Sequence, residues 1–329
     1  MSATLEVSPR QEDPGTDARE RFFAAPPSAG PDLSVTIGSL QLSNPVMPAS
    51  GCFGPELAPL VPVSEIGATV TKTLFADRRG GNPTHRLFET PFGMINSVGI
   101  PSPGTQGFID EVLPRYRTLG VPTIVSVGGL RVSEYLSVMD ELAATELDAV
   151  EVNVSCPNLE AGGLEIGTNP AAITEVVQGV VARTTAPVLV KLTPMVSSIT
   201  DVVRAAAEAG ASAVTVANSF PGLTLDEQHK PTLGNVVGGV SGPAIKPLAL
   251  RLVWEAVNAA DIPVIGCGGI RTTDDALDFL AVGATAIQVG TANFAHPYVM
   301  AEISRELAER CAQSGRPDLR TYVASLRGW

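Results

Sequence analysis

The chain contains few of the residues from which metal clusters and disulfide frameworks are built. Its four cysteines, Cys52, Cys156, Cys267 and Cys311, are scattered with no Cys-x-x-Cys pair, and there are three histidines. This spacing argues against an iron–sulfur cluster, a structural zinc site or another metal site within the chain. It is also unlike a disulfide framework, so we expect the protein in the reducing cytoplasm.

Positive charge and long apolar runs are scarce as well. The chain has 22 Lys and Arg against 34 Asp and Glu, a formal net charge of −12. Such a charge disfavours binding to nucleic acid or to an anionic membrane surface. No segment reaches 18 uninterrupted apolar residues, so no membrane span is expected.

Aromatic residues make up 5% of the sequence, against 44% for all hydrophobic residues. The core must therefore be built from Val, Ile, Leu and Ala, a composition typical of parallel strands buried on both faces. The 329 residues are enough for one (β/α)8 barrel, which typically needs about 250.

The first 31 residues differ from the rest of the chain. They carry five prolines and mixed charge, and they lack the apolar core of a signal peptide. We expect residues 1–31 to form a disordered Pro-rich tail without a function of its own. A barrel over residues 32–315 should follow, beginning with a short β-hairpin at 33–37 and 40–42 and ending before a C-terminal extension at 316–329.

Eight short strand-like runs, most of them followed by a helical stretch, repeat along the chain. Amphipathic spacing predicts helices around residues 135–143, 202–209 and 277–281, and Gly120, Gly210 and Gly283 are expected to end helices in the left-handed conformation. This alternation predicts an α/β fold, a closed (β/α)8 TIM barrel. A doubly wound open sheet is the alternative, but no early Gly-x-Gly-x-x-Gly turn supports it. The runs are 46–50, 68–74, 123–127, 149–154, 188–193, 213–217, 264–267 and 286–289.

Three connections, residues 75–104, 156–168 and 219–241, are too long for simple turns. All three follow the carboxyl ends of predicted strands, where the active sites of such barrels lie. We therefore expect functional loops there.

Cys156 and two lysines are the first candidates for chemistry. Cys156 follows the fourth strand in Asn153-Val-Ser-Cys-Pro-Asn158, where a thiol can act as a base; the alternative is a small buried core residue. Lys72 and Lys191 occupy similar positions in the second and fifth strands. A buried ammonium needs a partner, which a ligand anion or an electron-rich flavin supplies, whereas a lysine at a strand end can also reach solvent.

Glycines and amides are the second set of candidates. Gly268-Gly269 and Gly290-Thr291 follow the seventh and eighth strands, and Gly242 precedes a helix, so their backbone N–H groups suit a phosphate-bearing cofactor. A Gly-Gly pair also serves as a tight turn. Asn96 and Asn218-Ser219 offer amide and hydroxyl groups that match a planar ring with carbonyl and N–H groups, although single asparagines are often turn residues. Cys52 and Cys267 are interpreted as structural and Cys311 as inert.

Together these motifs resemble the class 1 dihydroorotate dehydrogenases over about residues 33–310. The resemblance is carried by Ala49-Ser-Gly51, Lys72-Thr73, Asn96-Ser-Val-Gly-Ile100, Asn153-Val-Ser-Cys-Pro-Asn158, Lys191, Asn218-Ser219, the run Gly-Gly-Val-Ser-Gly-Pro-Ala-Ile-Lys-Pro at 238–247, Gly268-Gly269 and Gly290-Thr291.

The resemblance implies one FMN at the barrel mouth and the oxidation of dihydroorotate to orotate in pyrimidine biosynthesis. Cys156 would remove the C5 proton while hydride leaves C6 for the flavin. The implied FMN residues are Ser50, Gly51, Lys72, Thr73, Ser126, Asn153, Lys191, Ala217, Gly242, Gly268, Gly269, Gly290 and Thr291. The implied substrate residues are Lys72, Asn96, Val98, Gly99, Ile100, Asn153, Asn218 and Ser219.

Within class 1, the 238–247 run and Gly290-Thr-Ala-Asn-Phe294 resemble the NAD-linked branch, class 1B, more than the fumarate-using homodimeric branch. The resemblance to class 1B implies a homodimer that can join a partner subunit carrying FAD and a [2Fe–2S] cluster into a heterotetramer. The absence of cluster-forming cysteines here fits this arrangement.

Two departures from the family pattern leave alternatives open. Ser126 stands where the family often has Asn near the flavin, and the 219–241 connection has no close match. A flavin barrel reductase acting on another dihydropyrimidine therefore remains an alternative. A tRNA-dihydrouridine enzyme is disfavoured by the charge of −12. A third alternative is a phosphate-binding barrel without flavin.

Overall fold

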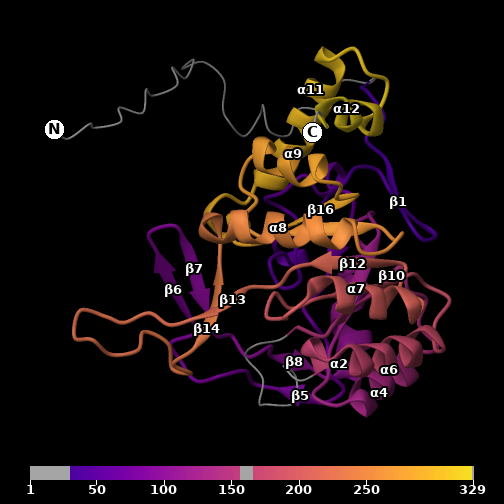
Figure 1. The fold of residues 1–329 in the computed structure, drawn as a ribbon. Helices are drawn as coiled ribbons and strands as arrows, with labels where there is room; N and C mark the ends of the chain where they lie inside the picture. The colour runs from indigo at the N-terminus through magenta and orange to yellow at the C-terminus, as the bar shows by residue number, and fades with distance from the viewer. Residues whose placement is uncertain (1–29, 156–165, 328–329) are drawn as a thin grey trace.

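A computed structural model describes residues 30–155 and 166–327 of the chain. At its centre, eight parallel strands follow one another in chain order around one sheet (Figure 1). The backbone N–H of Gly67, just before the second strand, donates to the carbonyl of Val46 in the first strand at 2.8 Å, which brings the two ends of the sheet together. This confirms the predicted TIM barrel and excludes the doubly wound sheet. The strands are β3 (Val46–Pro48), β4 (Thr69–Val70), β9 (Thr123–Val127), β10 (Ala149–Asn153), β11 (Val188–Lys191), β12 (Ala213–Val216), β15 (Val264–Cys267) and β16 (Ala286–Val289).

Helices form the outer layer of the barrel (Figure 1). The three helices predicted from amphipathic spacing are present, and Gly120, Gly210 and Gly283 have φ angles of 73°, 98° and 116°. The longer helices are α3 (Leu113–Arg117), α4 (Val132–Glu141), α6 (Pro170–Val181), α7 (Ile199–Glu208), α8 (Lys246–Val257), α9 (Thr273–Ala281), α11 (Val299–Gln313) and α12 (Leu319–Leu326). Short helical turns are η1 (Pro55–Leu57), η2 (Val63–Glu65), α2 (Thr105–Gly107), η3 (Phe108–Val112), η4 (Pro243–Ile245) and α10 (Ala292–Ala295).

Two apolar cores hold these layers together. The larger core lies between the strands and the helices. The smaller one lies inside the barrel, where Ile37 and Leu42 of the predicted hairpin, β1 (Val35–Ile37) and β2 (Leu40–Leu42), pack among inward residues such as Met47, Ile124 and Ile265. Because these inward residues lie at or near the start of their strands, the hairpin closes the amino end of the barrel and leaves the carboxyl end for a ligand.

The long connections at 75–104 and 219–241 form antiparallel strands, which the sequence pattern did not predict. β6 (Leu87–Thr90) and β7 (Gly93–Asn96) pair with β13 (Phe220–Gly222) and β14 (Gly238–Ser241) in the order β13-β14-β7-β6. We call this four-stranded unit the accessory sheet; it projects from one side of the barrel (Figure 1). β5 (Arg78–Arg79) and β8 (Ser102–Pro103) form a second small pair. Most of the third connection, residues 156–168, lies outside the described residues.

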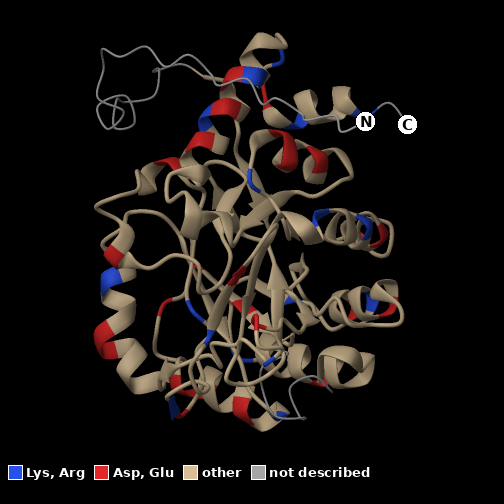
Figure 2. Cartoon of the chain, turned by 90° about the vertical axis from the view of Figure 1, so that its left-hand side faces the viewer, with Lys and Arg blue, Asp and Glu red and all other residues tan. Residues whose placement is uncertain are grey.

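The described ends of the chain lie together. Leu319 N–H donates to the carbonyl of Asp32 at 2.8 Å, and α12 buries Leu319, Tyr322 and Val323 in the larger core. The expected tail at 1–31 lies almost entirely outside the described residues. Charged residues of both signs lie mainly on the outer helices (Figure 2). Within the described ranges, no helix combines the length and apolar character needed to cross a bilayer.

Candidate active site

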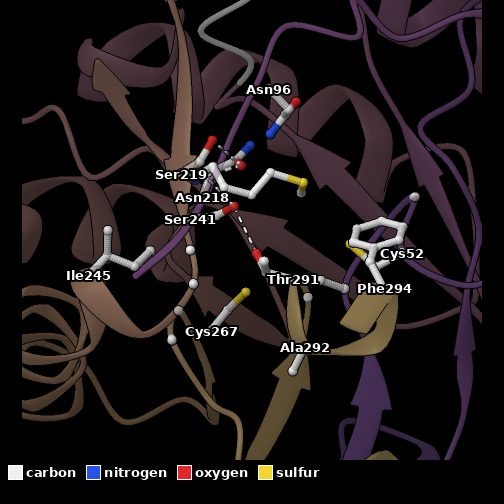
Figure 3. A pocket seen from close by; sticks show the side chains of 18 of the residues that line it. Cys52, Asn96, Asn218, Ser219, Ser241, Ile245, Cys267, Thr291, Ala292 and Phe294 are labelled. Atoms are coloured by element: carbon white, nitrogen blue, oxygen red, sulfur yellow. Dashed lines mark hydrogen bonds between the residues drawn. The ribbon is translucent and has the colours of Figure 1, made fainter. Parts of the chain in front are cut away.

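A pocket of about 850 Å³ opens at the carboxyl ends of the strands, between the barrel and the accessory sheet. Figure 3 shows Asn96, Asn218 and Ser219 on one side of it and Cys267 and Ala292 on the opposite side. The structure brings the following predicted site residues together on its walls: Ser50, Gly51, Lys72, Thr73, Asn96, Val98, Gly99, Ile100, Asn153, Lys191, Ala217, Asn218, Ser219, Gly242, Gly268, Gly269, Gly290 and Thr291.

One predicted residue among those described is placed differently. Ser126 is fully buried and does not line the pocket; its hydroxyl lies 3.0 Å from Thr73 Oγ1, behind the pocket wall. Thr73 Oγ1 in turn accepts a hydrogen bond from Asn153 Nδ2 at 2.9 Å. Ser126 therefore acts on the pocket through Thr73. Cys156 lies outside the described residues.

Lys191 provides a buried cation at the pocket floor. Its Nζ donates to Gln288 Oε1 at 2.7 Å and lies 3.8 Å from Cys267 Sγ. Burial by itself lowers the pKa of this ammonium, but its hydrogen bond to the Cys267 sulfur and the neighbouring Glu151 outweigh burial and hold the pKa above its usual value. Lys191 is therefore positively charged at neutral pH.

The loop that leads to Cys156 is anchored at the pocket wall. Asn218 Nδ2 donates to Ser155 Oγ at 2.8 Å, and Ser155 Oγ donates to Asn153 Oδ1 at 2.8 Å. Ser155 is buried and immediately precedes Cys156 in the chain. The segment therefore leaves β10 at a fixed point beside Asn218.

Asn96 reaches the same pocket from the accessory sheet. It belongs to β7, and its Nδ2 donates to the Gly239 carbonyl of β14 at 3.3 Å. This bond links the connections at 75–104 and 219–241, which the sequence pattern predicted as separate loops. Amide groups from β7 and from the end of β12 consequently share one side of the pocket.

Glycine turns form the wall after β14 and β15. Gly242, Gly268 and Gly269 have φ angles of 97°, 134° and 77°, which side chains rarely adopt. A Cβ on Gly269 would lie 2.7 Å from Lys246 Cβ, so the turn packs tightly against the start of α8. Thr291 Oγ1 donates to Ser241 Oγ at 2.7 Å and ties the end of β16 to the end of β14 (Figure 3).

Several residues in or below the pocket were not predicted as site residues from the sequence. Cys52 and Cys267, interpreted as structural, line the pocket, as do Ser241 and the exposed Phe92 and Phe294. Glu151 and Gln288 lie below it, each between two apolar residues of its strand. Glu151 and Gln288 could have been identified from the sequence, because an acid and an amide are unusual inside buried strands.

The sequence was compared with known proteins. The sequence pattern of the family described as dihydroorotate dehydrogenase matches residues 32–311. A Trichlorobacter lovleyi protein named dihydroorotate dehydrogenase B (NAD(+)), catalytic subunit, is 44% identical over 302 residues, covering 91% of this chain and 99% of the relative. The proteins of that name from Geotalea uraniireducens and Alkaliphilus oremlandii are 43% and 41% identical, each covering 90% of this chain and 98% and 99% of their own.

The fold also matches a solved structure. A crystal structure of DHODH from Eimeria tenella, in complex with ferulenol, superposes with a TM-score of 0.74 at 20% identity and covers 93% of this chain and 92% of its own. That likeness supports the barrel fold. The family match and the identity to the bacterial relatives extend over most of the sequence, and the chain therefore belongs to the dihydroorotate dehydrogenase family.

Proposed function

We propose that this chain is the FMN-binding catalytic subunit of a class 1B dihydroorotate dehydrogenase, which oxidises dihydroorotate to orotate. The observation that carries the proposal is that the described residues implied by the family resemblance meet on the walls of one pocket, except for Ser126, which lies behind Thr73. The names of the bacterial relatives support the same activity and the NAD-linked branch.

The residues present fit FMN. The glycine turns around Gly242, Gly268, Gly269 and Gly290 offer backbone to a phosphate group, and Lys191 supplies a positive charge at the floor. When bound, FMN supplies a two-electron acceptor. Ser50, Gly51, Thr73, Asn153, Ala217 and Thr291 would complete the walls of its site, with Ser126 supporting Thr73 from behind.

The substrate side of the proposed site is polar. Lys72 is suited to the carboxylate of dihydroorotate, and Asn96, Asn153, Asn218 and Ser219 offer donors and acceptors to its carbonyl and N–H groups. Val98, Gly99 and Ile100 supply the adjoining backbone. These groups would hold a planar ring in one orientation.

Cys156 is proposed as the base that accepts the C5 proton. The proposal is supported by the anchoring of the preceding Ser155 to Asn153 and Asn218, both of which line the pocket. Nearby hydrogen-bond donors would favour the thiolate form of a thiol at this position.

A partner subunit is proposed for the second half of the reaction. Among the described residues, no group of His, Cys, Asp and Glu side chains is arranged to hold a metal ion. Because the bacterial relatives are named as catalytic subunits of an NAD(+)-linked enzyme, we propose that a homodimer of this chain joins subunits carrying FAD and a [2Fe–2S] cluster, which pass electrons to NAD, and that the complex works in the cytoplasm.

The test is an anaerobic titration of the purified chain with dihydroorotate, monitored by the absorption of oxidised flavin. Stoichiometric bleaching is the expected result. A yellow protein that bleaches with another dihydropyrimidine but not with dihydroorotate would retain the flavin site and overturn the substrate. A colourless protein that does not take up FMN would overturn the proposed function.

A further inference from the structure

Three fully buried polar residues lie one layer below the pocket floor. Glu151, Thr215 and Gln288 are each 0% exposed, and the neighbours of each within its strand are apolar. Each precedes a pocket-lining residue by two positions, namely Asn153, Ala217 and Gly290. Because side chains alternate along a strand, all three point into the barrel toward the same centre.

These side chains form a connected hydrogen-bond network that ends at Lys191. Glu151 Oε2 accepts from Gln288 Nε2 at 2.6 Å and from Thr215 Oγ1 at 3.1 Å. Gln288 Oε1 accepts from Lys191 Nζ at 2.7 Å. The amide of Gln288 is thus oriented by both neighbours, with its nitrogen toward the carboxylate and its oxygen toward the ammonium.

The network has a cost that a purely structural role does not explain. Glu151 Oε1 is buried without a hydrogen-bond partner in the structure. A buried carboxylate is expensive unless a charge or hydrogen bonds compensate it, and apolar residues fill barrel interiors at lower cost. The charge of Lys191 provides this compensation.

The other titratable groups around Lys191 do not supply a negative charge at neutral pH. Burial raises the pKa of Cys267, despite the opposing effect of Lys191, and raises that of Cys52 to about 11, so both remain thiols. Lys72, also on the pocket wall, carries the same sign as Lys191. Glu151 is the acidic side chain that the hydrogen-bond network connects to Lys191.

We propose that Glu151 is a positioning residue: through the Gln288 amide, its carboxylate keeps the Lys191 ammonium charged and fixed at the pocket floor. There the ammonium opposes the negative charge that a bound flavin gains on reduction. The inference rests on the proposed FMN site and adds to it a residue that does not touch the ligand.

The test replaces Glu151 with its uncharged isostere and measures the midpoint potential of bound FMN against pH. In Glu151→Gln, the pKa of Lys191 is expected to fall, because burial is no longer opposed by a carboxylate. At pH 6.5 the variant's potential should not lie below that of wild type. At pH 9.5 the variant's preference for reduced over oxidised FMN should be at least tenfold weaker than that of wild type. For a two-electron couple this corresponds to a midpoint potential that is lower by about 30 mV.

Thr215→Val is the matched control, because it removes the other hydrogen bond to Glu151 but retains the charge. Its potential should follow that of wild type at every pH. If Glu151→Gln does not yield folded flavoprotein, Gln288→Met breaks the same link and should give a smaller weakening that is also confined to high pH.

The outcomes separate this inference from the proposed function. A difference between Glu151→Gln and wild type that is the same at all pH values, or absent, overturns the positioning role while the FMN site stands. A wild-type chain that binds no FMN overturns both.

Discussion

Two cysteines, Cys52 and Cys267, line the pocket, and their burial makes both of them poor bases. Burial raises the pKa of the Cys52 thiol to about 11 and that of the Cys267 thiol as well. Neither thiol is suited to accept a proton at neutral pH, because almost none of it is thiolate. Cys156 remains the proposed base, and Ser155, the residue before it in the chain, is held by Asn218.

Replacing Cys156 with Ser should slow the reduction of bound flavin by dihydroorotate by about 10²–10⁴-fold at pH 7, because a hydroxyl is a much poorer base at this pH than a thiol. Flavin content should be unchanged. Anaerobic stopped-flow absorbance measures the rate. Cys311→Ser, in α11 and away from the pocket, is the control and should react at the wild-type rate. An unchanged rate in Cys156→Ser would remove Cys156 from the base role.

At the scale of elements, the glycine turn after β15 is held by the start of α9. Asp275 Oδ2 accepts from the backbone N–H groups of Arg271 and Thr272, each at 2.9 Å, and Lys246 of α8 pairs with its Oδ1. Burial raises the pKa of the Asp275 carboxyl, but hydrogen bonds from Lys246 and Arg271 outweigh it and hold the pKa below its usual value. This carboxylate therefore links α8, α9 and the wall of the pocket.

Asp275→Asn should lower the free energy of unfolding by about 1–3 kcal/mol at pH 7. Since the folded pKa lies below the unfolded value of about 3.9, the stabilisation is present above that value and is lost as pH falls through the folded pKa. The difference from wild type should therefore shrink below about pH 4. Urea unfolding across pH measures it. Asp278→Asn is the control, because this exposed carboxylate pairs with the same Lys246 but does not hold the turn, and a loss above about 1 kcal/mol there would contradict the account.

The β1–β2 hairpin is the second element with a distinct role, because it fills the amino end of the barrel. Ile37→Ala should lower the free energy of unfolding by about 2–5 kcal/mol, since Ile37 is fully buried in the smaller core. Thr36→Ala, exposed on the same strand, should change it by less than about 0.5 kcal/mol. Denaturant midpoints measure both. Equal effects of the two substitutions would show that the hairpin does not form part of the core.

At the scale of the whole molecule, the proposed division of labour between subunits predicts a half-reaction. The chain alone should accept electrons from dihydroorotate but should not pass them to NAD at a comparable rate, because the FAD and the [2Fe–2S] cluster are assigned to a partner. NADH formation, followed at 340 nm with and without the co-expressed partner, measures this. NADH produced equally fast by the chain alone would contradict the two-subunit proposal.

The sequence by itself determined the barrel and the first candidates around its mouth, and the family resemblance supplied the fuller set of residues. Strand runs of Val, Ile and Ala, with glycines at the ends of helices, specify local elements whose order leaves few alternatives to a closed parallel sheet. Lys72, Lys191 and the glycine pairs stand at strand ends, and the carboxyl ends of parallel strands meet at one edge. Their convergence on one pocket therefore followed from local pattern alone.

Tertiary structure alone decided the accessory sheet and the layer beneath the pocket. β7 and β14 pair across more than a hundred residues of chain, through Asn96 and Gly239, and short turn-rich runs carry no local signal of such a partner. The place of Ser126 behind Thr73, and the connection of Glu151 to Lys191 through Gln288, likewise depend on which strands become neighbours inside the barrel. Local sequence sets the direction in which a side chain points, whereas long-range packing sets what it meets.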